Sequence, residues 1–253
     1  MTMRRGWREN PSCGAWTRAR LVIAFIAAAV AMTTAASFAT GEDGPVARML
    51  RRVLTATQAT ANVVLERSDP FGGPPERERG RVWYIPGRGL RYQANGAKGM
   101  QLALDRSADR MLLYKPSEPK VYKGNWSKAP SKLRRLVAEP ERVLKGSLDA
   151  GAERRVVRGA SREGWSLKPA SLDDSDSRAS IWISPDPKSG LPRFVSVASD
   201  VDTLLVEFGS WSFPKAARPG DLSVRVPRGT PEGPLDPREL LDMKDGAGER
   251  ERR

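Results

Sequence analysis

Residues 80–94 read GRVWYIPGRGLRYQA, two extended runs on either side of a tight turn. The runs Arg81–Ile85 and Leu90–Ala94 are rich in aromatic and branched apolar residues, which favour β-strands. The residues between them, PGRG, are of the kind that turns require. This stretch therefore predicts an antiparallel hairpin, and the chain on both sides of it repeats the pattern.

Further short extended runs are separated by Gly, Pro, Asn and Asp. They are Ala61–Arg67, Met100–Asp105, Arg110–Tyr114, Lys120–Lys123, Arg154–Gly159, Trp165–Lys168, Ser180–Ser184, Arg193–Ser199, Thr203–Trp211 and Ser223–Val226. The segment Ser68–Arg79 is polar and rich in Pro and Gly, so we expect a long exposed loop there. Because most of the connections are short, the sequence predicts a mainly β (α+β) fold: one large antiparallel sheet of about 11 strands that curls towards a barrel.

Two helical segments interrupt the strands. In the first, Asp43 can cap, Pro45 suits the first helical position, and apolar residues recur at helical spacing: Val46, Met49, Leu50, Val53 and Leu54. Arg48, Arg51 and Arg52 occupy its other side. This is either an ordinary surface helix packed on the core or a movable lid or membrane-surface helix. A second helical segment is predicted at Ser131–Lys145.

The N-terminus has the pattern of a secretory signal peptide. Five arginines in the first 20 residues precede the apolar run Leu21–Met32 and a small-residue stretch with a cleavage site before Thr40. The apolar run is shorter than the roughly 20 residues that cross a bilayer, although an uncleaved anchor is the alternative. We therefore expect a signal peptide at 1–39, a periplasmic domain at 40–235 and a charged, disordered tail at 236–253.

The composition excludes much catalytic chemistry. The chain has no His, and its single Cys, Cys13, lies in the predicted leader. Histidine-based triads, the common zinc sites and disulfides are therefore not expected in the exported domain.

The remaining acidic residues do not suggest a site either. The densest cluster, Asp173, Asp174 and Asp176, lies in a Ser- and Asp-rich segment that lacks the spacing of a calcium loop, so we interpret it as a solvated loop. No glycine-rich phosphate loop or G-x-S-x-G motif is present. We expect no catalytic residues, metal or cofactor, and hence a protein that is not an enzyme.

The charge balance is basic, with 43 Lys plus Arg against 30 Asp plus Glu and a formal net charge of +13. In a cytosolic protein, such a balance would suggest nucleic acid as a partner. Behind a signal peptide, the available anions are lipid head groups, envelope polymers and acidic proteins. We therefore expect no nucleic acid partner.

Apolar residues alternate with other residues along several predicted strands. Examples are Leu102 and Leu104, Ile181 and Ile183, and the series Leu204, Val206 and Phe208. One face of the sheet is consistently apolar. It either forms a plain core or, where the helices cover it only partly, leaves a cavity for an apolar ligand.

Five motifs in order resemble one family. They are GRVWYIPGRGLRY at 80–92, LLYKP at 112–116 with Lys120 and Val121, WSLKP at 165–169, DPKSGLP at 186–192, and the segment 213–227 that ends in VRVP. They are similar to strand and turn motifs of the periplasmic carriers of outer-membrane lipoproteins, the LolA-like family, across roughly residues 45–230.

The resemblance implies an incomplete antiparallel barrel with helices across its mouth and a cavity that takes lipoprotein acyl chains. The implied lipid-binding residues are Trp83, Leu102, Leu104, Leu167, Ile181, Ile183, Leu204, Val206 and Phe208. The implied lid or gating residues are Met49, Leu50, Val53, Leu54, Arg88 and Arg91. Many members have a lid-engaging basic residue before the turn proline, where this chain has Ile85, so Arg88 and Arg91 are the candidates for that role.

The resemblance also implies partners. A monomeric carrier would receive lipoproteins from an inner-membrane release complex and deliver them to an outer-membrane acceptor. The alternatives are an envelope regulatory or sensory module of the same fold that binds a partner protein or lipid signal, and a structural protein that attaches to anionic polymer or lipid.

Overall fold

The computed structural model describes residues 45–69, 71–96, 99–116, 120–129, 134, 151–167, 180–198, 203–218 and 220–235. The predicted leader, the acidic cluster at 173–176 and the tail at 236–253 lie outside the described residues. So does the second predicted helix, apart from Arg134, which is helical.

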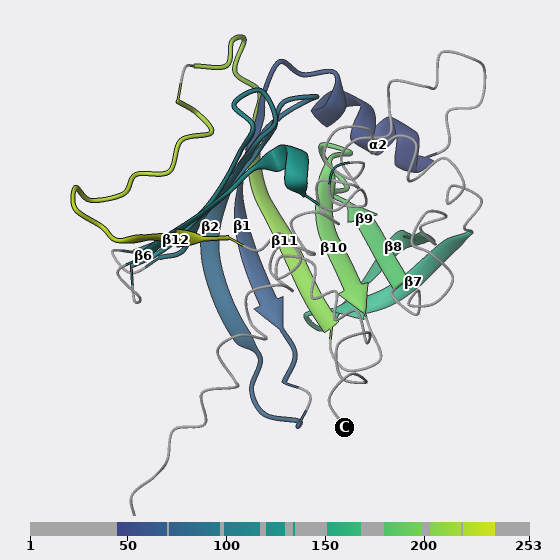
Figure 1. Ribbon diagram of the computed structural model, residues 1–253. Coiled ribbons are helices and arrows are strands. Elements are labelled where there is room, and N and C mark those ends of the chain that lie inside the picture. Colours follow the sequence, from purple (N-terminus) through teal and green to yellow (C-terminus); the bar gives the residue numbers. More distant parts are fainter. Residues whose placement is uncertain are drawn as a thin grey trace, which may run out of the picture.

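One open sheet of 12 strands dominates the described residues (Figure 1). The strands are β1 (Ala59–Arg67), β2 (Glu76–Ile85), β3 (Gly89–Ala94), β4 (Gln101–Asp105), β5 (Arg110–Lys115), β6 (Lys120–Gly124), β7 (Ala152–Val157), β8 (Ala160–Leu167), β9 (Ser180–Pro185), β10 (Pro192–Ala198), β11 (Thr203–Ser212) and β12 (Glu232–Pro234). The sheet curves but does not close, since β12 and β7 form its two edges. The mainly β, incomplete barrel predicted from the sequence is therefore confirmed.

The sheet consists of two meanders joined by one long-range pairing. Strands β1 to β6 and β7 to β11 follow each other in order, and β1 pairs with β11 between the two groups. Every pairing is antiparallel except that of β12 with β6, which is parallel. The hairpin of residues 80–94 is present as β2 and β3, with Val82 opposite Tyr92.

Several strand predictions need correction. The predicted strand Arg154–Gly159 runs past the end of β7 into a turn, and β8 begins at Ala160, five residues before the predicted start at Trp165. Ser223–Val226 is not a strand; its valines pack onto the outer face of the sheet, and β12 forms at Glu232–Pro234 instead. The predicted loop Ser68–Arg79 is shorter, because β2 already begins at Glu76, opposite Arg67. An ion pair of 2.8 Å between Arg77 and Glu66 supports this end of the hairpin.

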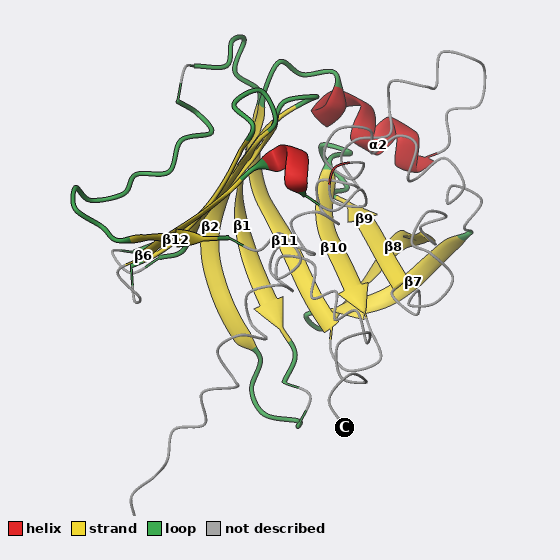
Figure 2. Cartoon of the chain, in the orientation of Figure 1, coloured by secondary structure: helices red, strands yellow, loops and turns green. Residues whose placement is uncertain are grey.

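Helix α2 (Pro45–Leu54) lies across the mouth of the curved sheet, and a short 3-10 turn, η2 (Trp126–Lys128), lies on the same side (Figure 2). The helix begins at the predicted proline and has apolar side chains on one face. Val46, Met49, Leu50 and Val53 are buried against the sheet, whereas Arg48, Arg51 and Arg52 are exposed. We call the face of the sheet towards α2 the inner face. Within the described residues, no helix is long and apolar enough to cross a membrane.

Candidate functional site

The inner face carries the main apolar cluster. Eight of the nine predicted lipid-binding residues belong to it: Leu102, Leu104, Leu167, Ile181, Ile183, Leu204, Val206 and Phe208. They come from four strands, β4 of the first meander and β8, β9 and β11 of the second, and alternation along each strand directs them to the same side. Their exposed fractions lie between 0% and 8%, so they form a packed interior beneath α2.

Trp83 is separated from this cluster. Its neighbours Val82 and Tyr84 belong to the inner cluster, so Trp83 points to the opposite, outer face. There, the guanidinium of Arg91 lies 4.6 Å from the centre of the Trp83 ring, and that of Arg81 lies 5.2 Å from it. Because residues 82–84 are all apolar, the sequence could not show which of them face inwards.

The predicted lid residues also divide into two groups. Met49, Leu50 and Val53 are buried in the inner cluster, and Leu54 packs against it. Arg88 instead pairs with Asp105, with 3.3 Å between Nη2 and Oδ2. Arg91 is buried on the outer face, where it donates a hydrogen bond to Gln93. The structure therefore places the helical residues at the mouth, and gives neither of these two arginines a contact with α2 among the interactions of the described residues.

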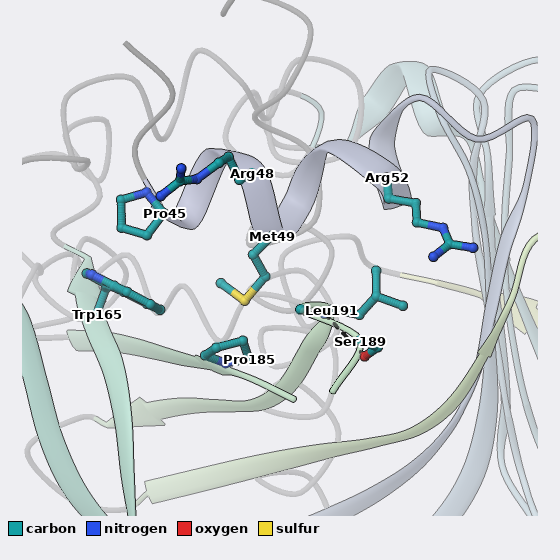
Figure 3. Close-up of a pocket in the computed structure, with 9 residues that line it drawn as sticks. Pro45, Arg48, Met49, Arg52, Trp165, Pro185, Ser189 and Leu191 are labelled. Atoms are coloured by element: carbon teal, nitrogen blue, oxygen red, sulfur yellow. Dashed lines mark hydrogen bonds between the residues drawn. The ribbon is translucent and has the colours of Figure 1, made fainter. Parts of the chain in front are cut away.

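A cavity of about 360 Å³ opens beneath α2 (Figure 3). Pro45, Arg48, Met49 and Arg52 of the helix line it from above, and Trp165, Pro185, Ser189, Gly190 and Leu191 line it from the sheet. The thioether of Met49 points into this space between the helix and Pro185. None of the nine predicted lipid-binding residues lines this cavity, because eight are packed deeper in the inner cluster and Trp83 lies on the outer face.

An aromatic row on β11 leads from the inner cluster to the end of the helix. The Phe208 and Trp211 rings stack with centroids 4.9 Å apart, and Trp211 and Phe213 follow at 6.3 Å. The Trp211 indole donates a 2.9 Å hydrogen bond to the Pro192 carbonyl. The Arg52 guanidinium lies over Phe213. Helix α2 therefore rests on the sheet through both its apolar face and this row.

A β-bulge explains why sequence reasoning missed the row. Strict alternation would turn Trp211 away from Phe208, since the two are three residues apart. In the structure, Ala61 pairs with Trp211 and Val63 with Phe208, so the β1–β11 register shifts between them. The extra residue brings both rings to one side. Gly209, inside the strand, is the sequence signal that could have indicated the bulge.

The cavity's rim is basic. Arg48 and Arg52 are exposed at its edge, and α2 contains no acidic residue between Pro45 and Leu54. The nearest carboxylate along the lining segment, Asp186, is held within its own turn, where it accepts hydrogen bonds from the Ser189 hydroxyl at 2.8 Å and the Ser189 amide at 2.9 Å. These hydrogen bonds lower the pKa of Asp186.

Two groups on the strands have pKa values shifted by their surroundings. Burial, together with the neighbouring Glu78 carboxylate that accepts its hydrogen bond, raises the pKa of Tyr92. Burial alone would raise the pKa of Asp105, but hydrogen bonds from Ser107 and Arg88 outweigh it and lower the pKa below its ordinary value. The hydrogen bonds of Tyr92 and Asp105 connect neighbouring strands or turns, and neither residue lines the cavity.

The site is an apolar cavity with positively charged side chains at its rim. Among the described residues, no group of three or more His, Cys, Asp or Glu side chains could hold a metal ion. The groups at the cavity can bury hydrocarbon and attract an anion; they supply no pair of acid and base aimed at a common point.

No protein-family model matches the chain, and a search of curated proteins finds no match. Solved structures of similar fold include a LolA superfamily protein from Nitrosomonas europaea, with 7% identity over 68% of this chain and 92% of that one, at a TM-score of 0.35. The lipoprotein LppX from Mycobacterium tuberculosis is 13% identical over 72% and 96%, with a TM-score of 0.41. LprF from Mycobacterium bovis is 12% identical over 85% and 98%, with a TM-score of 0.37.

Proposed function

We propose that this protein is a non-enzymatic periplasmic carrier that shields lipoprotein acyl chains during transfer from the inner to the outer membrane. The observation that carries the proposal is the cavity between an amphipathic helix and an apolar, curved sheet. The helix is short and is not part of the sheet, so it can be displaced without breaking the strand ladders. Its displacement would expose the predicted lipid-binding residues.

The energies are of the right size for reversible loading. Exposing an acyl chain to water costs about 0.8 kcal/mol per methylene, so a sixteen-carbon chain costs on the order of 12 kcal/mol. The four buried side chains of α2 contribute roughly 1.5 to 3 kcal/mol each when they leave water. A chain that replaces this apolar stripe on the inner face would therefore offset most of the cost of lifting the helix.

Saturable uptake of a fluorescent acyl probe by the purified protein tests the proposal. The variant Met49→Trp should fill the cavity and weaken uptake, because Met49 lines it. Val156→Trp is the matched control, since Val156 is 76% exposed and does not line the cavity. Unfolding temperatures should show that both variants remain folded.

Absence of saturable uptake by the wild-type protein would contradict the carrier function. If the protein instead captured a membrane-anchored regulator and no lipoprotein, the regulatory alternative would take its place. Equal weakening by Met49→Trp and Val156→Trp would show that the probe binds elsewhere.

A further inference from the structure

The arginines at the rim give the cavity a chemical preference that its apolar floor alone would not have. We propose that the cavity beneath α2 binds an amphiphile with a single acyl chain and an anionic head group, with Arg48 and Arg52 holding the head. This inference rests on the proposed function, because it specifies the ligand of the same site.

The floor and the rim differ in character. Leu191 and Pro185 supply hydrocarbon to the floor, Met49 supplies it from the helix above, and Trp165 supplies an aromatic wall. Arg48 and Arg52 supply the charge, and their side chains leave the helix on either side of Met49 (Figure 3). A ligand that matches both parts must combine an apolar chain with a negative group.

No acidic side chain of α2 neutralises the positive charge of its arginines. Like charges three or four residues apart on a helix repel each other, and Arg48 lies three and four residues before Arg51 and Arg52. No acidic residue lies in α2, and among the described residues neither Arg48 nor Arg52 forms an ion pair with a carboxylate. Asp186, beside the lining residue Pro185, is occupied by Ser189. An anion at the rim would relieve this repulsion.

The volume favours one chain. A water molecule occupies roughly 30 Å³ of the liquid, and a methylene is of similar size. The cavity of about 360 Å³ therefore holds on the order of a dozen methylenes, which corresponds to one acyl chain while α2 lies on the sheet. The volume is at the small end of the range of about 300 to 1,000 Å³ for ligand sites.

Two monomeric lysophospholipids with the same sixteen-carbon chain test this inference, one with an anionic phosphatidylglycerol head and one with a zwitterionic phosphatidylcholine head. Calorimetric titration should show about tenfold tighter binding of the anionic lipid, because a charge-assisted contact is worth that much. Arg48→Gln with Arg52→Gln should remove the preference, so that the two lipids bind with equal affinity. Arg51→Gln, which removes a charge from α2 outside the lining, should preserve the preference.

The position of the bound acyl chain can be measured in a separate experiment. A brominated chain should quench tryptophan fluorescence in the wild-type protein and much less in Trp165→Phe, since Trp165 lines the cavity. Added salt should reduce the preference for the anionic lipid, because mobile ions screen exposed charges.

The outcomes separate the two proposals. Equal affinity for the two lipids would overturn the inference and leave the carrier function standing, whereas no binding of either lipid or of the acyl probe would overturn both. Inorganic phosphate that binds alone with the same dependence on Arg48 and Arg52 would show a plain anion site and contradict the inference. Retention on anionic vesicles without uptake of either monomer would also contradict it and indicate a membrane-docking helix.

Discussion

The guanidinium carbon of Arg52 lies 4.9 Å from the centre of the Phe213 ring, so the last turn of α2 rests on the segment that follows β11. This contact is a cation–π interaction at a partly exposed site, where such pairs contribute about 0.5 to 1 kcal/mol. It connects the part of the molecule that we expect to move with the aromatic row that remains on the sheet.

Replacing Phe213 with Leu should therefore loosen the helix. We expect faster hydrogen exchange of the backbone amides in residues 45–54 and faster uptake of an acyl probe, with a loss of stability of about 1 kcal/mol. Phe71→Leu is the control, because Phe71 is 94% exposed and makes none of the ring contacts of the described residues. Similar exchange rates in the two variants would show that the ring does not hold the helix.

Trp83 provides a test of the two faces of the sheet. Because it packs between Arg81 and Arg91 on the outer face, Trp83→Leu should cost about 1 kcal/mol of stability and leave acyl uptake unchanged. Urea unfolding and probe titration measure the two effects. A loss of uptake at unchanged stability would contradict the separation of Trp83 from the site.

Gly164 lies where two strands approach closely. A Cβ atom added there would lie 2.4 Å from the Ile183 carbonyl oxygen and 2.6 Å from the Trp182 ring. Gly164→Ala should therefore destabilise the protein by roughly 1 to 3 kcal/mol, because the β8–β9 ladder must shift. Gly151→Ala is the matched control, since a Cβ there meets no atom within 4 Å. Equal denaturation midpoints would contradict the prediction.

The buried Asp105 should make stability depend on pH. Its pKa is lower in the folded state than its ordinary value of 3.8, so the ionised carboxylate stabilises the fold. This contribution is fully present above the unfolded pKa and is lost as the pH falls through the folded pKa. Asp105→Asn should thus be less stable than the wild type at pH 7, and the difference should shrink below about pH 4 in urea titrations. A difference independent of pH would exclude this role.

Most of the fold could be predicted from the sequence, because the helical spacing and the short strand runs are both clear in it. Helical spacing located α2, and short apolar runs located most strands. The prediction failed at Glu76–Arg79, where charges occupy both faces of β2, and at Ser223–Val226, where valines pack on the outer face without joining the ladder. In both places the polarity of the side chains does not follow the backbone pairing: charged residues join the ladder at Glu76–Arg79, and apolar residues at Ser223–Val226 do not.

The candidate site could be predicted only in part. Alternation identified the inward residues of β4, β9 and β11, and eight of the nine predicted residues share one face. The cavity could not be predicted from periodicity, because its lining comes from helix α2, strands β8 and β9, and the turn between β9 and β10. The orientation of Trp211 could not be predicted, because it depends on the β-bulge opposite Asn62. That bulge arises from the pairing of strands that are far apart in the chain.

That same pairing has a kinetic consequence. Thr60 lies opposite Ser212, so the seam between the meanders cannot form until the chain from β1 to β11 is available for folding. Contacts between such distant parts of a chain form slowly. During the delay, β1 is an unpaired strand edge, and the apolar face of the first meander is exposed to solvent. Partly folded chains aggregate under such conditions. Folding of this protein should therefore depend on chaperones more than its final stability would suggest.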